Sequence, residues 1–276
     1  MAGELPTIAA SDYLNSAVLM EDFLTGAQRR QCHLITDAAP ARCAELLRQG
    51  EVAAALIPAI EYQRIPNLLM VPGVAIGSKH TVRSVVMAAT KPLPEIRTVA
   101  LDTSSRTSVS LVRILFAEFY RYKVDFHPAP PDVPRMLAKA DAAVIIGDPA
   151  LTFDRTGLHV FDLAGEWRRL TGLPFVFAVW AVRESAQKAV AGLDFVAARE
   201  AGLRARAALA ARYARRLELP VETLVRYLEE NIHYGLEADD LAGLMYYWTL
   251  AAKHQLIERV RPIHWLPAAH GCSRPA

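Results

Sequence analysis

The chain has 276 residues, of which 53% are hydrophobic and 22% are charged. Lys and Arg together number 31, against 29 Asp and Glu, so the formal net charge is only +2. This is a globular composition, and the chain is long enough to bury one large core or two smaller ones. The near-neutral charge argues against a dedicated nucleic-acid-binding protein, which usually carries a clear basic excess.

No segment predicts export or insertion into a membrane. The first 15 residues have neither the basic nor the apolar region of a signal peptide. The longest apolar runs, such as 174–182, are too short to span a bilayer. Cys32, Cys43 and Cys272 show no CxxC spacing and no even count, which is typical of a reducing compartment. We therefore expect a cytoplasmic protein without membrane contact.

Strands and helices alternate through the first half of the chain. The pattern predicts strands over 7–10, 52–57, 82–89 and 98–101, and helices over 16–24, 41–48 and about 106–120. Further strands are expected over 142–146 and 175–182, and helices predominate from Glu184 onward, the last over about 238–260. Alternation of this kind predicts an α/β fold with a mainly parallel sheet.

Two of the expected strands suggest how the chain divides into lobes. The strands at 82–89 and 175–182 flank a central block of about 90 residues that has strand–helix units of its own. We expect these two strands to cross between a first lobe, 1–86 with 181–276, and a second lobe, 87–180. The cleft between two such lobes is a natural site for a small molecule.

The segment LDTSSRTS, at 101–108, brings polar side chains to the start of a helix. Free backbone N–H groups and the helix dipole favour an anion at such a position. The residues concerned are Thr103, Ser104, Ser105, Arg106 and Thr107. Arg106 can make a bidentate contact to a carboxylate. Capping of the helix requires only one hydroxyl residue, so the number of donors favours anion binding.

The segment SDYLN, at 11–15, follows the first expected strand. Ligands of open α/β sheets bind at this end of the strands, where Asn15 offers a donor and an acceptor and Tyr13 an aromatic wall. Asn15 can equally form a local turn and cap the next helix. The spacing alone leaves both interpretations open.

Two further positions are candidates for the cleft. Ser84 falls on one face of the expected strand 82–89, where its hydroxyl can donate to a substrate, although an ordinary small strand residue is the simpler interpretation. Gly147 and Asp148 follow the buried strand 142–146. Asp148 can face the cleft or cap the next turn, and the sequence does not choose between these roles.

Motifs for metals and common cofactors are absent from the sequence. The eight histidines show no HExxH or other paired spacing, so we expect no metal site. There is no GxSxG, Walker or GxGxxG motif. The arginines between 199 and 216 lie in an Ala-rich helical stretch and predict a solvated helix face.

Taken together, these segments resemble the chorismate dehydratase family. The resemblance rests on SDYLN, CAELLRQGEVAAALIPAIEY, VPGVAIGSKHTVRSV, VALDTSSRTS, AVIIGDPAL and LTGLPFVFAVWAVR, in this order between Ser11 and Arg183. It implies a type II periplasmic-binding-protein-like fold, that is, an α/β protein of two lobes joined by two crossing strands. It also implies a cytoplasmic lyase rather than a transport protein.

The resemblance further implies a reaction and a set of roles. Members of this family dehydrate chorismate to 3-(1-carboxyvinyloxy)benzoate without a metal or redox cofactor, as the first step of the futalosine route to menaquinone. The enolpyruvyl carboxylate of the substrate itself removes the ring C3 proton. Asn15 and Ser84 match the catalytic pair that orients this carboxylate and binds the ring hydroxyl. Tyr13, the segment 103–107, Gly147 and Asp148 are then the expected substrate contacts.

Two other functions use the same fold. A cytoplasmic solute-binding protein for a small carboxylate is the main alternative, because fold alone does not distinguish binding from catalysis. An enzyme acting later in the same pathway would be expected to place a histidine base in the cleft. No histidine of this chain lies in a recognised motif.

Overall fold

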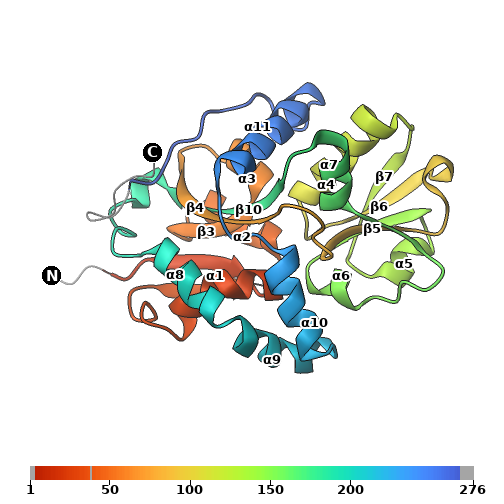
Figure 1. Cartoon of the computed structure of the whole chain (residues 1–276). Helices are drawn as coiled ribbons and strands as arrows, with labels where there is room; N and C mark the ends of the chain where they lie inside the picture. Colours follow the sequence, from red (N-terminus) through yellow and green to blue (C-terminus); the bar gives the residue numbers. More distant parts are fainter. Residues whose placement is uncertain (1–3, 38, 268–276) are drawn as a thin grey trace.

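The computed structural model describes residues 4–37 and 39–267. Two lobes lie side by side, each built on its own five-stranded sheet (Figure 1). The first sheet contains β1 (Thr7–Ser11), β2 (His33–Asp37), β3 (Ala54–Pro58), β4 (Leu68–Ser78) and β10 (Phe175–Arg183). The second contains β5 (Val85–Ala89), β6 (Thr98–Asp102), β7 (Asp125–Ala129), β8 (Ala142–Ile146) and β9 (His159–Asp162).

The two sheets have the same topology. Their strand orders are β2-β1-β3-β10-β4 and β7-β6-β8-β5-β9. In each sheet one strand, β10 or β5, runs antiparallel to both of its neighbours, and the other strands share one direction. The expectation of mainly parallel pairing is therefore confirmed. The structure differs in having two sheets, each of which contains one antiparallel strand.

The chain crosses between the lobes at two short segments. One crossing, 79–84, follows β4, and the other, 172–174, precedes β10. The strand expected over 82–89 begins only at Val85, because Arg83 has a φ of 59° and the backbone bends there. The stretch 175–180, expected in the second lobe, pairs within the first sheet. Its apolar pattern predicted a strand correctly but carried no information about its partners.

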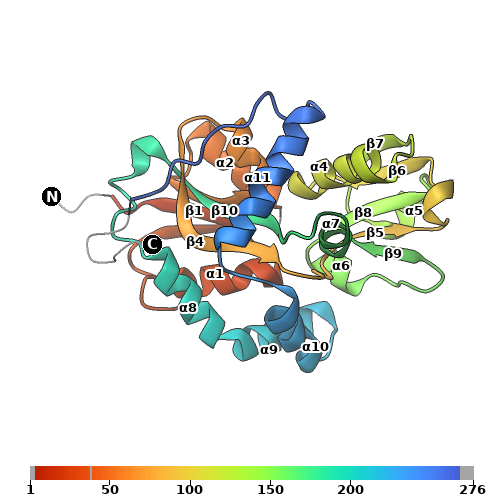
Figure 2. The same cartoon turned by 45° about the horizontal axis from the view of Figure 1, so that its top comes forward.

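Helices cover both faces of each sheet (Figures 1 and 2). Those of the second lobe are α4 (Thr107–Ile114), α5 (Val133–Leu137), α6 (Asp148–Thr152) and α7 (Leu163–Thr171). The first lobe carries α1 (Leu14–Leu24), α2 (Pro40–Gln49), α3 (Ala59–Arg64), α8 (Phe195–Arg204), α9 (Arg206–Leu217), α10 (Val221–Arg226) and α11 (Ala238–Lys253). The last helix ends at Lys253, earlier than the sequence pattern suggested. Helix α11 packs on β10 and also reaches α4, so it contacts both lobes.

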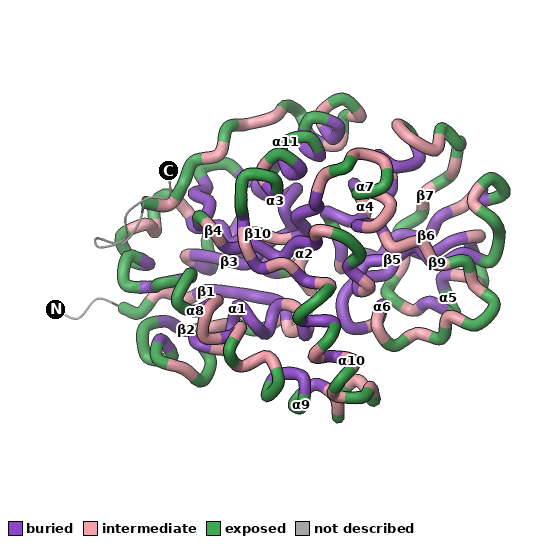
Figure 3. The backbone as a smooth tube through the Cα atoms, in the orientation of Figure 1, coloured by how far each residue is buried: buried purple, intermediate pink, exposed green. Residues whose placement is uncertain are grey.

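An aromatic cluster anchors the second crossing. Figure 3 shows that the central strands of both sheets are buried. The rings of Trp167, Phe175 and Tyr247 contact one another edge to face, with centroids 5.0 to 6.3 Å apart. The Trp167 indole donates to the carbonyl of Pro174 at 3.1 Å, inside the crossing itself. These contacts hold the return of the chain to the first lobe in place beside the cleft.

Candidate functional site

A narrow cleft lies between the lobes, with an accessible volume of about 50 Å³. It is lined by residues from the ends of strands and the starts of helices in both lobes: Ser11, Tyr13, Asn15, Ser16, Pro40, Leu56, Pro58, Ile76, Val85, Ser105, Arg106, Thr107, Ser108, Ile146, Gly147, Phe177 and Ala178. A volume of this size holds a few water molecules. The lobes are therefore closed upon one another in this structure.

The segment after β1 carries Asn15 into the cleft. Helix α1 begins at Leu14, and its N-cap is Tyr13, which makes no side-chain capping bond. Asn15 lies in the first turn, so the interpretation that it caps the helix is wrong. Its Oδ1 accepts a hydrogen bond from the Ser16 hydroxyl at 3.2 Å, and Ser16 in turn pairs with the hydroxyl of Ser11 at 2.9 Å. These hydrogen bonds orient the side-chain amide of Asn15 along one wall of the cleft.

The segment 103–107 is shaped by Asp102 at the end of β6. The buried Asp102 carboxylate accepts from the Ser104 N–H at 2.8 Å, the Ser104 hydroxyl at 2.6 Å and the Ile146 N–H at 3.3 Å. Burial raises the pKa of Asp102, although the bonds from Ser104 oppose that shift. Ser105, Arg106 and Thr107 line the cleft, whereas Thr103 and Ser104 do not.

Arg106 is the cationic side chain of the cleft lining. It occupies the N-cap position of α4 without a side-chain capping bond, so the hydroxyls of this segment do not serve as that cap. Within 4–37 and 39–267, no ion pair includes Arg106. The guanidinium and the N–H groups of the first turn of α4 together suit a carboxylate.

Ser84 lies directly behind the cleft wall. It sits in the bend before β5 and is 0% exposed, so its expected place on a strand face is wrong. Its carbonyl accepts from the Gly147 N–H at 2.8 Å, and its hydroxyl accepts from the Tyr227 phenol at 2.7 Å. Its neighbours Val85 and Gly147 line the cleft, which puts Ser84 one layer away from it.

Gly147 allows the two lobes to meet closely. Its φ is +66°, and a Cβ at this position would lie 2.6 Å from the ring of Tyr13. Only glycine accepts both this backbone conformation and this contact without strain. The ring of Tyr13, from the first lobe, thus lies directly against the backbone of the second.

Asp148 forms hydrogen bonds between the two lobes and does not line the cleft. Its carboxylate accepts from the Leu14 N–H of the first lobe at 2.9 Å and from Arg216 of α9 at 2.6 Å. Burial raises the pKa of Asp148, and the contacts to Leu14 and Arg216 partly offset that rise. Arg216 also pairs with Asp12 at 2.7 Å. It was expected on a solvated helix face, and nothing in the local pattern indicates its partner almost 70 residues away.

Apolar side chains form the remaining wall. They are Leu56, Ile76, Val85, Ile146 and Phe177, at the ends of strands from both sheets. A polar row at Asn15 and a cationic corner at Arg106 thus face an apolar surface suited to a ring. Leu56 and Ile76 alternate with core residues along their strands, so periodicity alone does not mark them as site residues.

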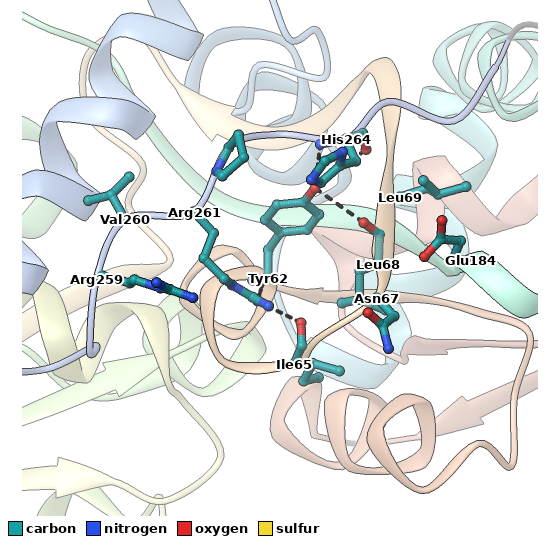
Figure 4. A pocket seen from close by; sticks show the side chains of 11 residues that line it. Tyr62, Ile65, Asn67, Leu68, Leu69, Glu184, Arg259, Val260, Arg261 and His264 are labelled. Atoms are coloured by element: carbon teal, nitrogen blue, oxygen red, sulfur yellow. Dashed lines mark hydrogen bonds between the residues drawn. The ribbon is translucent and has the colours of Figure 1, made fainter.

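A second cavity, of about 380 Å³, lies in the first lobe beneath the segment after α11 (Figure 4). The Tyr62 hydroxyl accepts from the His264 N–H at 2.8 Å there, and Arg261 donates to the carbonyl of Ile65 at 2.6 Å. None of the residues expected in the functional site lines this cavity. We therefore take the interlobe cleft as the candidate site.

A group of metal-ligand types occurs at the start of α11. His233, Glu237 and Asp240 bring one ligand atom each within 4.8 Å of one another. The Asp240 carboxylate accepts from the Glu237 N–H at 2.9 Å in a capping box, and Lys79 pairs with Glu237 at 2.6 Å. These contacts belong to the N-terminal cap of α11, and they explain why the three side chains lie close together.

Two closed lobes around a polar cleft define a periplasmic-binding-protein-like α/β protein. Solved structures share this fold at low identity. The aliphatic sulphonate binding protein SsuA from Escherichia coli is 16% identical, with a TM-score of 0.63 over 100% of this chain and 97% of its own. Protein AF1704 from Archaeoglobus fulgidus is 18% identical, with a TM-score of 0.68 over 93% of this chain and all of its own.

Sequence comparison identifies the family within this fold. The chain belongs to the menaquinone biosynthesis family, which it matches over residues 6–253. A chorismate dehydratase from Thermus thermophilus is 32% identical over 235 residues, which cover 76% of this chain and 83% of that protein. Among the described residues, no helix is long and apolar enough to cross a membrane.

Proposed function

We propose that this protein is a chorismate dehydratase that releases water from chorismate to give 3-(1-carboxyvinyloxy)benzoate, the first step of futalosine-dependent menaquinone biosynthesis. The observation that carries the proposal is the cleft of a menaquinone-family chain in which Asn15 from one lobe faces Arg106 and the start of α4 from the other. This arrangement suits a ring that bears two carboxylates.

The reaction places few demands on the protein. Removal of the ring C3 proton and departure of the C4 hydroxyl create the C3–C4 double bond and an aromatic ring, so the elimination is strongly favourable. It is redox-neutral and therefore needs no electron acceptor. The enolpyruvyl carboxylate takes the C3 proton and passes it to the oxygen that departs from C4, so this oxygen leaves as water and the carboxylate is regenerated. The protein contributes positioning and hydrogen bonds.

Each part of the cleft has a role in this scheme. Asn15 orients the enolpyruvyl carboxylate towards C3. Ser84 is buried one layer behind the cleft wall in the closed structure, so it donates to the C4 hydroxyl only when the wall moves aside and exposes it. Ser105, Arg106 and Thr107, with the free N–H groups of α4, hold the ring carboxylate. Tyr13 and Gly147 close the lobes over the substrate, while the apolar wall packs on its ring. The exclusion of water strengthens all of these contacts.

The proposal is tested by mixing the purified protein with chorismate. The cyclohexadiene absorbance should fall while the benzoate product appears, which mass spectrometry identifies. Asn15→Ala and Ser84→Ala should each lower kcat by about 100-fold or more and leave the melting temperature close to that of the native chain. Thr249→Ala, on the exposed face of α11, serves as the control. Full activity in both cleft variants would contradict their assignment.

The solute-binding alternative makes a different prediction. Sulphonate-binding proteins share this fold, so the cleft can in principle hold a carboxylate without transforming it. A thermal shift with chorismate and no turnover would favour that function. We also propose a cytoplasmic location, in keeping with Cys32 and Cys43, which are free and buried. Cys272 lies outside the described residues.

A further inference from the structure

Tyr227 lies next to both residues expected to be catalytic. It begins a π-helical turn, Tyr227–Asn231, that continues α10, and it is only 1% exposed. Its phenol donates to the Ser84 hydroxyl at 2.7 Å. The side chain of Asn15 lies near the same phenol. One hydroxyl from the C-terminal part of the chain is thus bonded to Ser84 and close to Asn15, which are far apart in sequence.

We propose that Tyr227 is a positioning residue, which fixes the direction of the Ser84 hydroxyl. This inference rests on the proposed function. A phenol has one proton, and here it is donated to Ser84 Oγ. The lone pair of Ser84 that faces Tyr227 is therefore occupied, and the Ser84 proton points elsewhere. Within the described residues no protein group accepts that proton, so Ser84 can donate it to the departing hydroxyl once the cleft wall exposes Ser84 to the substrate.

The surroundings of Tyr227 keep it a donor. Burial raises the pKa of Tyr227 well above its usual value, and the nearby Asp148 raises it further. The phenol consequently stays protonated at neutral pH. Hydrogen bonds in a chain polarise one another, so a serine that accepts from a phenol is a better donor to its next partner.

The backbone around Tyr227 is tied to the crossing segment that carries Ser84. Asn231 Nδ2 donates to the carbonyl of Thr81 at 3.0 Å. His233 and Gly77 exchange two backbone hydrogen bonds, each of 2.8 Å. The segment 227–233 therefore runs along 77–84 and is bonded to it at three places. These bonds fix the distance between Tyr227 and Ser84.

The test is Tyr227→Phe, which removes only the hydroxyl. We expect kcat for chorismate to fall by about 10- to 100-fold, because Ser84 loses its fixed orientation. KM should stay within about twofold, because Tyr227 does not line the cleft. The matched control is Tyr234→Phe, a buried tyrosine whose hydroxyl has no partner among the described residues. That variant should keep the native kcat.

A double variant separates positioning from an independent effect. If Tyr227 acts through Ser84, adding Tyr227→Phe to Ser84→Ala should change kcat by less than about twofold. Fully additive losses would overturn the proposal, as would a native kcat in folded Tyr227→Phe. Should that variant fail to fold, Asn231→Ala loosens the same segment at a half-buried position. It should lower kcat by about threefold or more without changing KM, and an unchanged kcat would again overturn the inference.

The native protein serves as the internal reference. Turnover of chorismate by the native chain together with native turnover by Tyr227→Phe would reject the role of Tyr227 alone. Absence of turnover by the native chain would reject the proposed function and, with it, the inference that depends on it.

Discussion

Single carboxylates determine where the loops around the cleft lie. Asp102 shapes the segment before α4, and Asp148 holds the start of α1. Asp162 accepts from the Val82 N–H at 3.0 Å and the Arg83 N–H at 2.6 Å, which fixes the first crossing. In each case the carboxylate accepts hydrogen bonds from backbone N–H groups that have no partner within a strand or helix. Charge-assisted bonds of this kind are stronger than neutral ones, so they order loops efficiently.

Asp141 is a residue of the same kind whose effect can be measured. Its carboxylate pairs with Lys91 at 2.6 Å and accepts from the Arg97 N–H at 2.8 Å and the Thr98 N–H at 3.0 Å. Lys91 and these two N–H groups lower the pKa of Asp141 to about 2. A carboxyl whose pKa is lower in the folded state stabilises the fold above its unfolded pKa and loses that effect as the pH falls.

We therefore expect Asp141→Asn to lower the free energy of unfolding at pH 7 by about 1 to 2 kcal/mol, after allowance for solvent screening. The difference from the native chain should shrink as the pH falls from about 4 towards 2. Urea denaturation at several pH values measures it. Asp125→Asn, an exposed carboxyl on β7 without an ion pair in the described part of the chain, is the control. A pH-independent difference would contradict the assignment.

At the scale of elements, the sequence predicted those whose pattern is set by burial alone. The buried strands β1, β3, β6 and β8 and the helices α1 and α2 were expected within a few residues of their observed bounds. Strands β2, β7 and β9 were not, because they are half-exposed and short, and lack a continuous apolar run. They are defined by hydrogen bonds to a neighbouring strand, which local sequence does not encode. The largely buried strand β4 was also missed, because Pro72 and Gly73 interrupt its apolar run and are typical of a turn.

In the candidate site, too, the sequence predicted some residues and missed others. Asn15, the segment 105–107 and Gly147 were predicted because they follow buried strands at the ligand-binding end of a sheet. The contact between Ser84 and Tyr227 joins positions 143 residues apart. No spacing rule brings them together, because their meeting depends on how the C-terminal helices pack against the first crossing.

Helix packing in the first lobe depends on a single glycine. Gly202 of α8 faces α1, and a Cβ there would lie 1.7 Å from the carbonyl oxygen of Val18. We expect Gly202→Ala to separate the two helices and to lower the free energy of unfolding by about 1 to 3 kcal/mol. Chemical denaturation measures the change. Gly192→Ala, where the nearest atom lies 4.0 Å away, should have little effect, and similar losses in both variants would contradict the packing argument.

At the scale of the whole molecule, one cluster of charges holds the lobes together. Arg216 contacts Asp12 of the first lobe and Asp148 of the second, and its guanidinium lies 4.1 Å from the ring centre of Tyr213. Because the closed cleft has little free volume, we expect chorismate to enter when this cluster opens. We therefore expect the cluster to stabilise the closed arrangement of the lobes.

Arg216→Ala should shift that balance towards the open form. We expect a larger radius of gyration by small-angle X-ray scattering without substrate, and a KM raised by about threefold or more, because closure over chorismate is weakened. Arg212→Ala is the matched control, since Arg212 lies on the same helix and pairs at 2.5 Å with Glu21 inside the first lobe. Adding Asp148→Asn should restore part of the closure, as it removes the unpaired buried charge. An unchanged radius in Arg216→Ala would contradict this role.

The shared topology of the two sheets has a consequence for synthesis of the chain. Among the described residues, strand β4 forms a ladder only with β10, which the ribosome produces about 100 residues later. Until β10 has been synthesised, one edge of β3 has no neighbouring strand, and the apolar strand β4 remains unpaired. The second lobe, by contrast, contains all five of its strands in one uninterrupted stretch. During synthesis, all strands of the second lobe are therefore available before the sheet of the first lobe is complete. Until then the first sheet has an exposed strand edge, which favours aggregation or chaperone binding.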